Sequence, residues 1–229
     1  TGKTTTVRGM LAMFDFMGSK TVLAAPTGRA AKRMSELCGR EAKTIHRLLE
    51  VGFDNNGMRF LRNTENPLEA DVIILDEMSM VDVSLMASLL AAVKNSCRLV
   101  LVGDPDQLPS VGPGNVLKDI LASGVITAIH LDEIFRQARE SDIILNAHAV
   151  NRGELPSLKN NKKDFFFMQR NTPGEVADTI IDLCARRLPN NMGIDPEDIQ
   201  VISPLKRNDC GVEELNRRLQ NILNPHNEL

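Results

Sequence analysis

Two apolar runs that end abruptly in acidic residues constrain the fold of this chain most strongly. Residues 71–76 (DVIILD) lead into Glu77, and residues 98–103 (RLVLVG) lead into Asp104. Neither run alternates polar and apolar side chains, which is typical of strands buried on both faces of a parallel sheet. Because parallel strands end at one edge, where open α/β sheets bind ligands, we expect these acids to share a site.

Strand and helix patterns alternate along most of the chain. The predicted strands are residues 20–25, 71–76, 98–103 and 126–131, and the predicted helices are residues 4–17, 28–38, 44–51, 82–94, 114–122 and 140–151. This order predicts an α/β fold in which a parallel sheet lies between helices.

A polar stretch divides the chain. Residues 151–163 contain Gly153 and Pro156 and are predicted to form a linker. Residues 165–169, a helix over 174–188, a strand over 199–204 and a helix over 211–223 then begin a second α/β unit. The expected domains are residues 1–155 and 156–229, and the second is expected to be incomplete.

The chain opens with a short phosphate-binding pattern, Gly2, Lys3 and Thr4, directly before a predicted helix. Backbone N–H groups at such a helix start face phosphate oxygens, the lysine reaches the β- and γ-phosphates, and the threonine hydroxyl binds Mg²⁺. The alternative is a simple helix cap. The full phosphate-loop motif has a further glycine that would precede Thr1, so we expect the chain to be an excerpt of a longer one.

The acids at the two strand ends suit nucleotide chemistry. Asp76 is predicted to hold Mg²⁺ through water, and Glu77 to polarise the water that attacks the γ-phosphate of ATP. The alternative is that both acids only favour the start of the next helix. Asp104 is expected beside the nucleotide, and the amide of Gln107, which donates and accepts, is suited to sense the γ-phosphate. For Gln107 the alternative is a polar turn around Pro105.

A basic segment early in the chain is suited to bind nucleic acid. Pro26, Thr27 and Gly28 precede a predicted helix that carries Arg29 in its first turn. Exposed N–H groups and a hydroxyl at a helix start bind a phosphate, and His46 is expected to continue the track, although a lone histidine is more often structural. Because the chain has no Trp or Tyr, the track should depend on phosphate contacts rather than on aromatic stacking.

The charge is unevenly distributed, although the net charge is only −3. Residues 1–62 hold 11 Lys/Arg against 5 Asp/Glu, and residues 63–155 hold 6 against 14. A basic region beside an acidic one fits a polyanion track next to a metal–nucleotide site, and the alternative is an ordinary solvated surface.

The cysteines and the hydropathy exclude other classes of protein. The four cysteines are far apart and form no CxxC pair, so we expect reduced thiols and no zinc site. No apolar run is long enough to cross a bilayer, and the first residues show no signal-peptide pattern. These features predict a soluble, cytoplasmic protein that does not associate with a membrane.

Six segments, taken in order, resemble motifs I, Ia, Ib, II, III and IV of superfamily 1 helicases: TGKTTT, APTGRAAKRM, TIHRLL, DVIILDEMSMVD, LVGDPDQLPSVGPGNVL and LDEIFRQ. Among these helicases the chain is most similar to the RecD-like group, the exodeoxyribonuclease V alpha-subunit family. The resemblance implies two RecA-like P-loop NTPase domains that clamp ATP, move 5′-to-3′ along single-stranded DNA and separate duplexes in recombination and repair.

Matched residue by residue, the resemblance implies a role for each candidate. Lys3 and Thr4 would form the phosphate-loop pair, Asp76 and Glu77 the Walker B acids, Gln107 the coupling glutamine and Arg136 the arginine of motif IV, close to the γ-phosphate in the transition state. The expected cofactors are ATP and Mg²⁺. The expected partners are single-stranded DNA, duplex junctions and other exodeoxyribonuclease V subunits.

Two alternatives stay open from the sequence. One is a non-motor subunit that binds DNA under nucleotide control, and the other is the helicase part of a conjugative relaxase.

The sequence departs from the pattern of the family in two ways. Motifs V and VI are absent, and Asn208 stands where relatives often have glycine. The change to asparagine is harmless, because asparagine tolerates a left-handed backbone. Because those motifs carry the second arginine, we expect this segment alone not to hydrolyse ATP productively.

Overall fold

The computed structural model describes residues 2–54, 57–131, 141–159 and 164–225. The chain divides into two compact units, residues 1–140 with 147–154, and residues 141–146 with 155–229. Each unit is described by itself. The interpretation of the chain as one motor domain followed by the start of another stays a prediction.

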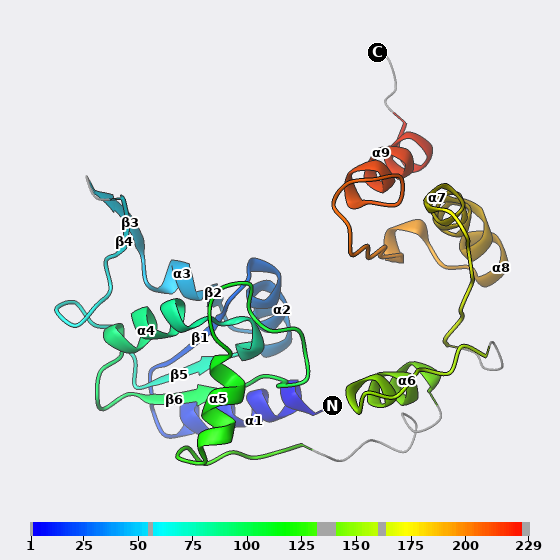
Figure 1. The fold of residues 1–229 in the computed structure, drawn as a ribbon. Helices are drawn as coiled ribbons and strands as arrows, with labels where there is room; N and C mark the ends of the chain where they lie inside the picture. Colours follow the sequence, from blue (N-terminus) through cyan, green and yellow to red (C-terminus); the bar gives the residue numbers. More distant parts are fainter. Residues whose placement is uncertain (1, 55–56, 132–140, 160–163, 226–229) are drawn as a thin grey trace. The chain divides into compact units, whose positions relative to one another are not determined.

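A four-stranded parallel sheet forms the centre of the first unit, with the strand order β2–β1–β5–β6 (Figure 1). The strands are β1 (Thr21–Ala25), β2 (Ala42–Thr44), β5 (Val72–Leu75) and β6 (Arg98–Leu101). Ile74 of β5 lies opposite Leu23 on one side and Val100 on the other. The predicted parallel α/β sheet is therefore confirmed, and β2 is an additional strand at its edge.

Helices cover both faces of this sheet (Figure 1). The helices that cover the sheet are α1 (Lys3–Phe16), α2 (Gly28–Cys38), α3 (Ile45–Leu48), α4 (Val83–Ala92) and α5 (Val116–Ser123). Side chains of α1 and α2 pack on one face, and those of α3, α4 and α5 pack on the other. This arrangement explains why the central strands are apolar throughout.

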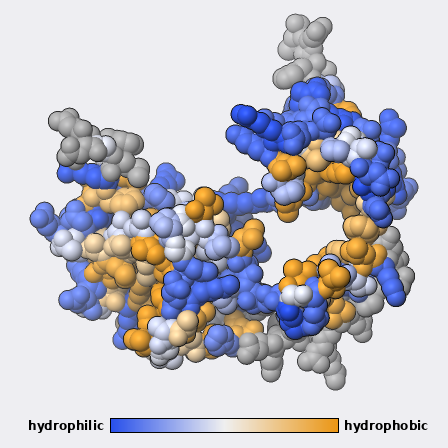
Figure 2. Space-filling view, in the orientation of Figure 1, coloured by the Kyte–Doolittle hydropathy of each residue, from blue (hydrophilic) through white to orange (hydrophobic). Residues whose placement is uncertain are grey.

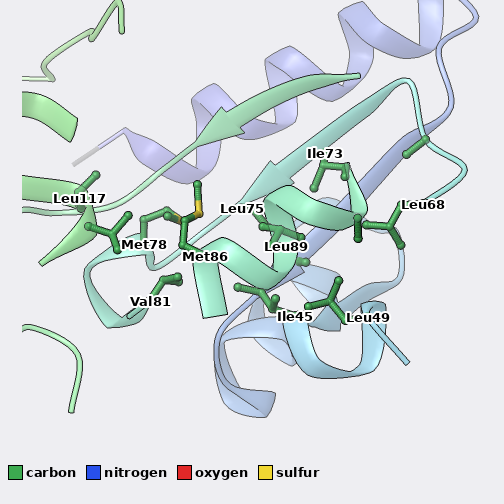
Figure 3. Close-up of a cluster of buried hydrophobic side chains, with 14 residues drawn as sticks. Ile45, Leu49, Leu68, Ile73, Leu75, Met78, Val81, Met86, Leu89 and Leu117 are labelled. Atoms are coloured by element: carbon green, nitrogen blue, oxygen red, sulfur yellow. The ribbon is translucent and has the colours of Figure 1, made fainter. Parts of the chain in front are cut away.

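The central strand β5 supplies both cores, because successive side chains of a strand point to opposite faces. Val72 and Ile74 belong to the core beneath α1 and α2. Ile73 and Leu75 belong to the larger core, which also holds Leu89 of α4 (Figure 3). All four β5 side chains are fully buried.

Two adjacent leucines of α4 provide a test of this core. Leu89 is 0% exposed and Leu90 is 51% exposed. We expect Leu89→Ala to lower the free energy of unfolding by about 2–5 kcal/mol, because it removes buried methyl groups and leaves a cavity. Leu90→Ala should change it by about 0.5 kcal/mol or less. Urea denaturation measures both, and equal losses would contradict this assignment of the core.

An antiparallel hairpin follows α3 and was not predicted. It consists of β3 (Val51–Asp54) and β4 (Gly57–Phe60). The helix predicted over residues 44–51 is shorter than expected, because the backbone of Glu50 is left-handed, with φ of 55°. This conformation cannot continue a right-handed helix, so the chain turns into β3.

The regular structure described in the second unit consists of helices and helical turns joined by loops. It contains the first turn of α6 (Asp142–Asn151), α7 (Pro173–Asp182), a π-helical turn (Leu183–Arg187), α8 (Leu188–Met192), a 3₁₀ turn (Pro196–Asp198) and α9 (Val212–Leu223). Ala177 and Cys184 are buried, and so is Leu215 of α9. An ion pair of 2.6 Å between Arg218 and Asp178 joins α9 to α7.

The strands predicted over residues 126–131 and 199–204 are wrong, and residues 165–169 form no strand either. A strand is stable only when its backbone groups pair with a neighbouring strand, and none of these segments has such a partner in the described residues. Ile126 and Ile129 are accordingly 55% and 86% exposed. Apolar side chains also lie at the surface of each unit, where Figure 2 shows orange patches among hydrophilic residues.

No helix that the structure describes has both the length and the apolar character needed to cross a bilayer.

Candidate functional site

A pocket of about 200 Å³ brings together side chains that are far apart in the sequence. Lys3 and Thr4 come from the start of α1, Asp76 and Glu77 from the end of β5, and Gln107 from the loop after β6. The structure therefore places these residues around one pocket, as the strand ends predicted. That they bind a nucleotide stays a prediction.

Backbone hydrogen bonds fix the two acids at the end of β5. The amide of Asp76 donates to the carbonyl of Ala24 at 3.0 Å, and the amide of Met78 donates to the carbonyl of Val102 at 3.1 Å. The amide of Glu77 donates to Oδ1 of Asp76 at 2.9 Å. The acids are thus held between the ends of β1 and β6, so their side chains start from well-defined positions.

Glu77 has an unusual backbone and an unpaired side chain. Its φ and ψ are 54° and 43°, in the left-handed region, and a 3₁₀ turn (Met78–Met80) follows. Its Oε2 atom is buried and has no hydrogen-bond partner among the described residues. A left-handed non-glycine residue and a buried unpaired polar atom each cost about 1–3 kcal/mol. A fold that keeps both features at a pocket favours a functional role for this carboxylate.

The oxygen donors of the pocket fit a magnesium ion bound together with a nucleotide. Mg²⁺ in phosphate-transfer sites takes one or two protein carboxylates and completes its shell with phosphate oxygens and water. The Thr4 hydroxyl and the Asp76 carboxylate supply that kind of incomplete set. Within the described part of the chain, no group of three or more His, Cys, Asp or Glu side chains could hold a metal by itself.

Sequence reasoning missed two residues that line the pocket, Arg33 and Cys38 of α2. The signal was helical spacing, because Ala30, Arg33 and Leu37 fall on one face of α2, and all three line the pocket. Arg33 adds a second cation to that of Lys3.

The thiol of Cys38 is a poor nucleophile at neutral pH. Burial raises its pKa most, the positive charge of Arg8 opposes this rise, and the negative charge of Asp76 adds to it. Because the thiolate is the reactive form, a raised pKa leaves the protonated thiol at neutral pH. Cys38 therefore contributes packing rather than nucleophilic chemistry.

Two other candidates, Gly2 and Asp104, do not line the pocket. The Asp104 carboxylate accepts a hydrogen bond from the amide of Asp106 at 3.0 Å, and its carbonyl accepts one from the amide of Gln107 at 3.3 Å. Asp104 thus shapes the turn that presents Gln107. The carbonyl of Gly2 accepts a hydrogen bond from the amide of Thr6 at 2.9 Å at the start of α1. Arg136 lies outside the described residues.

Close packing explains the glycine that precedes this turn. A Cβ atom on Gly103 would lie 2.8 Å from Cδ2 of Leu117 and 3.2 Å from the backbone nitrogen of Met78. The Leu117 methyl group could move aside, but the backbone of Met78 would have to shift to accommodate a larger residue at this position. Gly103 therefore permits the close approach that sets the loop with Gln107 beside the acids.

The predicted nucleic-acid residues lie at two adjacent strand ends. Ala25 and Thr44, the last residues of β1 and β2, lie opposite each other, and α2 and α3 begin close beyond them. The Oγ1 atom of Thr27 accepts a hydrogen bond from the amide of Ala30 at 3.2 Å and caps α2. Pro26, Gly28 and Arg29 flank this cap.

His46 makes a contact that was not predicted. Its ring lies 5.8 Å from that of Phe60 in the hairpin, centroid to centroid, at an angle of 56°. His46 is nevertheless exposed. The histidine therefore has a structural role against β4, and its contact with nucleic acid stays a prediction.

Comparisons with known proteins identify the family. Residues 1–113 match the family model described as an AAA domain. Over 225 residues, 98% of the chain, the sequence is 36% identical to the ATP-dependent RecD2 DNA helicase of Deinococcus radiodurans. The chain belongs to the RecD-like superfamily 1 helicases. The RecBCD enzyme subunit RecD of Mycolicibacterium smegmatis is 44% identical over 144 residues, 53% of the chain.

This RecD-like chain spans 29% and 26% of the length of these two relatives. Among solved structures, the Pif1 helicase from Bacteroides in complex with ADP-AlF3 and ssDNA matches with a TM-score of 0.44 at 19% identity, covering 83% of this chain and 45% of that one. The sheet between helices and the phosphate-binding pattern at α1 together give the RecD-like chain an α/β P-loop NTPase fold.

Proposed function

We propose that this chain is part of an ATP-hydrolysing DNA helicase motor that moves 5′-to-3′ along single-stranded DNA in recombination and repair. The observation that carries the proposal is the pocket in which Lys3, Thr4, Asp76, Glu77 and Gln107 converge. Family membership supports the same function. The substrates we propose are single-stranded DNA and its junctions with duplex.

In this mechanism each pocket residue has a separate task. The Lys3 ammonium would bind the β- and γ-phosphates of ATP, and Thr4 and Asp76 would hold Mg²⁺. When bound, Mg²⁺ neutralises negative charge on the phosphates. The Glu77 carboxylate orients the attacking water and accepts its proton, and the Gln107 amide donates a hydrogen bond to the γ-phosphate.

We propose two arginines as additional sources of positive charge. Arg33 faces the pocket from α2 and suits a phosphate oxygen. Arg136 is proposed to stabilise the charge that develops on the transferred phosphate. Both proposed roles depend on the planar guanidinium group, whose N–H donors can form two hydrogen bonds with one phosphate.

The loop after β6 suggests how ATP binding is coupled to DNA binding at the track residues. Gln107 senses the γ-phosphate on the turn shaped by Asp104, and the track residues Thr27 and His46 follow neighbouring strands of the same sheet. ATP binding would order this edge of the sheet, and release of phosphate would relax it. Repeated cycles would then move the strand.

Strand displacement tests the proposal against a DNA-binding subunit that does not move. We expect the protein to separate duplexes that carry a 5′ single-stranded tail and not those that carry only a 3′ tail, in the presence of ATP and Mg²⁺. Fluorescently labelled duplexes measure both reactions. ATP binding without displacement of either substrate would favour a nucleotide-controlled clamp.

Association with other exodeoxyribonuclease V subunits is a separate part of the proposal. Its support is similarity to proteins named RecBCD enzyme subunit RecD. Co-purification of the tagged protein from its own cells would show such subunits. A protein that unwinds DNA without them would act as an independent motor, and the same experiment would recover a relaxase domain if one were fused to it.

A further inference from the structure

A second pocket in the first unit, also of about 200 Å³, is lined by basic side chains at the base of the β3–β4 hairpin. Four cationic residues line it: Lys20, Lys43, Arg47 and Arg62. It shares no lining residue with the pocket around Lys3. The two pockets are therefore separate sites on the same unit.

The carboxylates at this second pocket are already paired. Glu50 forms an ion pair of 2.8 Å with Arg62, and Glu69 forms one of 2.6 Å with Lys94. The hydrogen bond from Lys94 lowers the pKa of Glu69 most, and the charge of Lys20 contributes to the same shift. Each acid thus has a cationic partner that balances its charge.

The positive charges of Lys43 and Arg47 are not neutralised by an acidic partner among the described residues. Neither the Lys43 ammonium nor the Arg47 guanidinium has a hydrogen bond or an ion pair with any residue that the structure describes, and both are exposed. The Nε atom of Arg62 is buried and has no acceptor within the described chain. Like charges gathered around one concavity attract an anion, which also supplies hydrogen-bond acceptors.

The position of the pocket indicates which anion it takes. Lys43 precedes Thr44 at the end of β2, and Arg47 follows His46 in α3. The pocket therefore begins beside Thr44 and His46 of the proposed DNA track and reaches Lys20 and Ala70, which precede β1 and β5 at the amino ends of these strands. The pocket lining also includes the apolar residues Val22 and Ile73, which offer no base-specific hydrogen bonds. A pocket that offers positive charge but no hydrogen bonds to bases suits a backbone phosphate of DNA, which is recognised independently of sequence.

We propose that this pocket binds a backbone phosphate of DNA and extends the track from the strand ends to the base of the hairpin. Lys43 and Arg47 supply the direct contacts, and Lys20 adds positive charge. The Arg62–Glu50 ion pair fixes the wall of the pocket. This inference rests on the proposed function as a DNA-binding motor, but it involves none of the residues assigned to ATP.

Salt-dependent DNA binding tests the pocket with a matched pair of charge reversals, Lys43→Glu and Lys118→Glu. Lys118 is exposed on α5 and does not line the pocket. The affinity of the 229-residue chain for fluorescent single-stranded DNA is measured by anisotropy at several salt concentrations. Removing one phosphate contact lowers the slope of log affinity against log salt by about 0.7. We expect this shallower slope, with a several-fold weaker affinity, only in Lys43→Glu.

Further readouts separate the possible outcomes. Fluorescent ATP should bind both variants equally, and the two variants should have the same midpoint of thermal unfolding. If Lys43→Glu does not fold, Lys43→Gln is measured in its place. The same slope in the pocket variant as in Lys118→Glu would overturn the inference. Binding of inorganic phosphate that is lost in Lys43→Glu, together with an unchanged DNA affinity of this variant, would also overturn it, because the pocket would then bind the free ion. Absence of DNA binding by the unsubstituted chain would instead refute the proposed function.

Discussion

Replacing Lys3 by alanine should abolish the DNA-stimulated ATPase activity of the intact protein, with a loss of about 100-fold or more in kcat. Lys3 is the residue of the pocket that we assign to the β- and γ-phosphates, and it lies at the start of α1. Its ammonium would stabilise negative charge that grows in the transition state, so its removal should lower kcat as well as ATP affinity. A coupled assay for ADP release measures the effect.

Lys118→Ala is the matched control for this substitution. It removes the same charge from an exposed position of α5 that lies outside both pockets. Its turnover should equal that of the unsubstituted protein. If Lys3→Ala also retained full turnover, the assignment of the pocket to ATP would be wrong, whatever the similarity to helicases.

The parallel sheet could be predicted because its central strands are apolar without interruption. All residues of β5 are fully buried, so no polar side chain interrupts the pattern. The convergence of Asp76, Glu77 and Gln107 followed from the same observation. Neighbouring parallel strands must end at one edge, and the pairing of β5 with β6 places these side chains there.

The hairpin was missed although its signal is in the sequence. Asn56 and Gly57 stand between two segments rich in apolar residues, and an Asn-Gly pair in this setting is the strongest short hairpin signal. The edge strand β2 was harder to predict. It contains only three residues, AKT, and its stability comes from pairing with β1 rather than from its own side chains.

Two strands were predicted that the structure does not contain, because their sequences resemble strands but have no pairing partner among the described residues. Residues 126–131 and 199–204 have the apolar composition of strands, but composition does not supply a partner for their backbone groups. Helical spacing groups Arg33 with Ala30 and Leu37 on one face of α2, but which face of α2 lines the pocket depends on how α2 packs against α1. Packing between helices is a tertiary property that local patterns do not determine.

Glu77→Gln should separate ATP binding from ATP hydrolysis. The substitution keeps the size of the side chain and removes the carboxylate that we propose as the proton acceptor. General base catalysis contributes about 10²–10⁴-fold, so we expect a loss of that size in turnover. Affinity for fluorescent ATP should stay within a few-fold, because the phosphates are held by Lys3 and by Mg²⁺.

The unfolding of this variant gives a second, independent readout. Oε2 of Glu77 is buried without a partner among the described residues, and an unpaired buried charge destabilises a fold. Glu77→Gln should therefore unfold at an equal or higher urea concentration than the unsubstituted protein. Glu65→Gln, at an exposed position away from both pockets, should change neither hydrolysis nor stability. A variant at position 77 that lost stability but kept its turnover would show that this carboxylate supports the fold rather than the reaction.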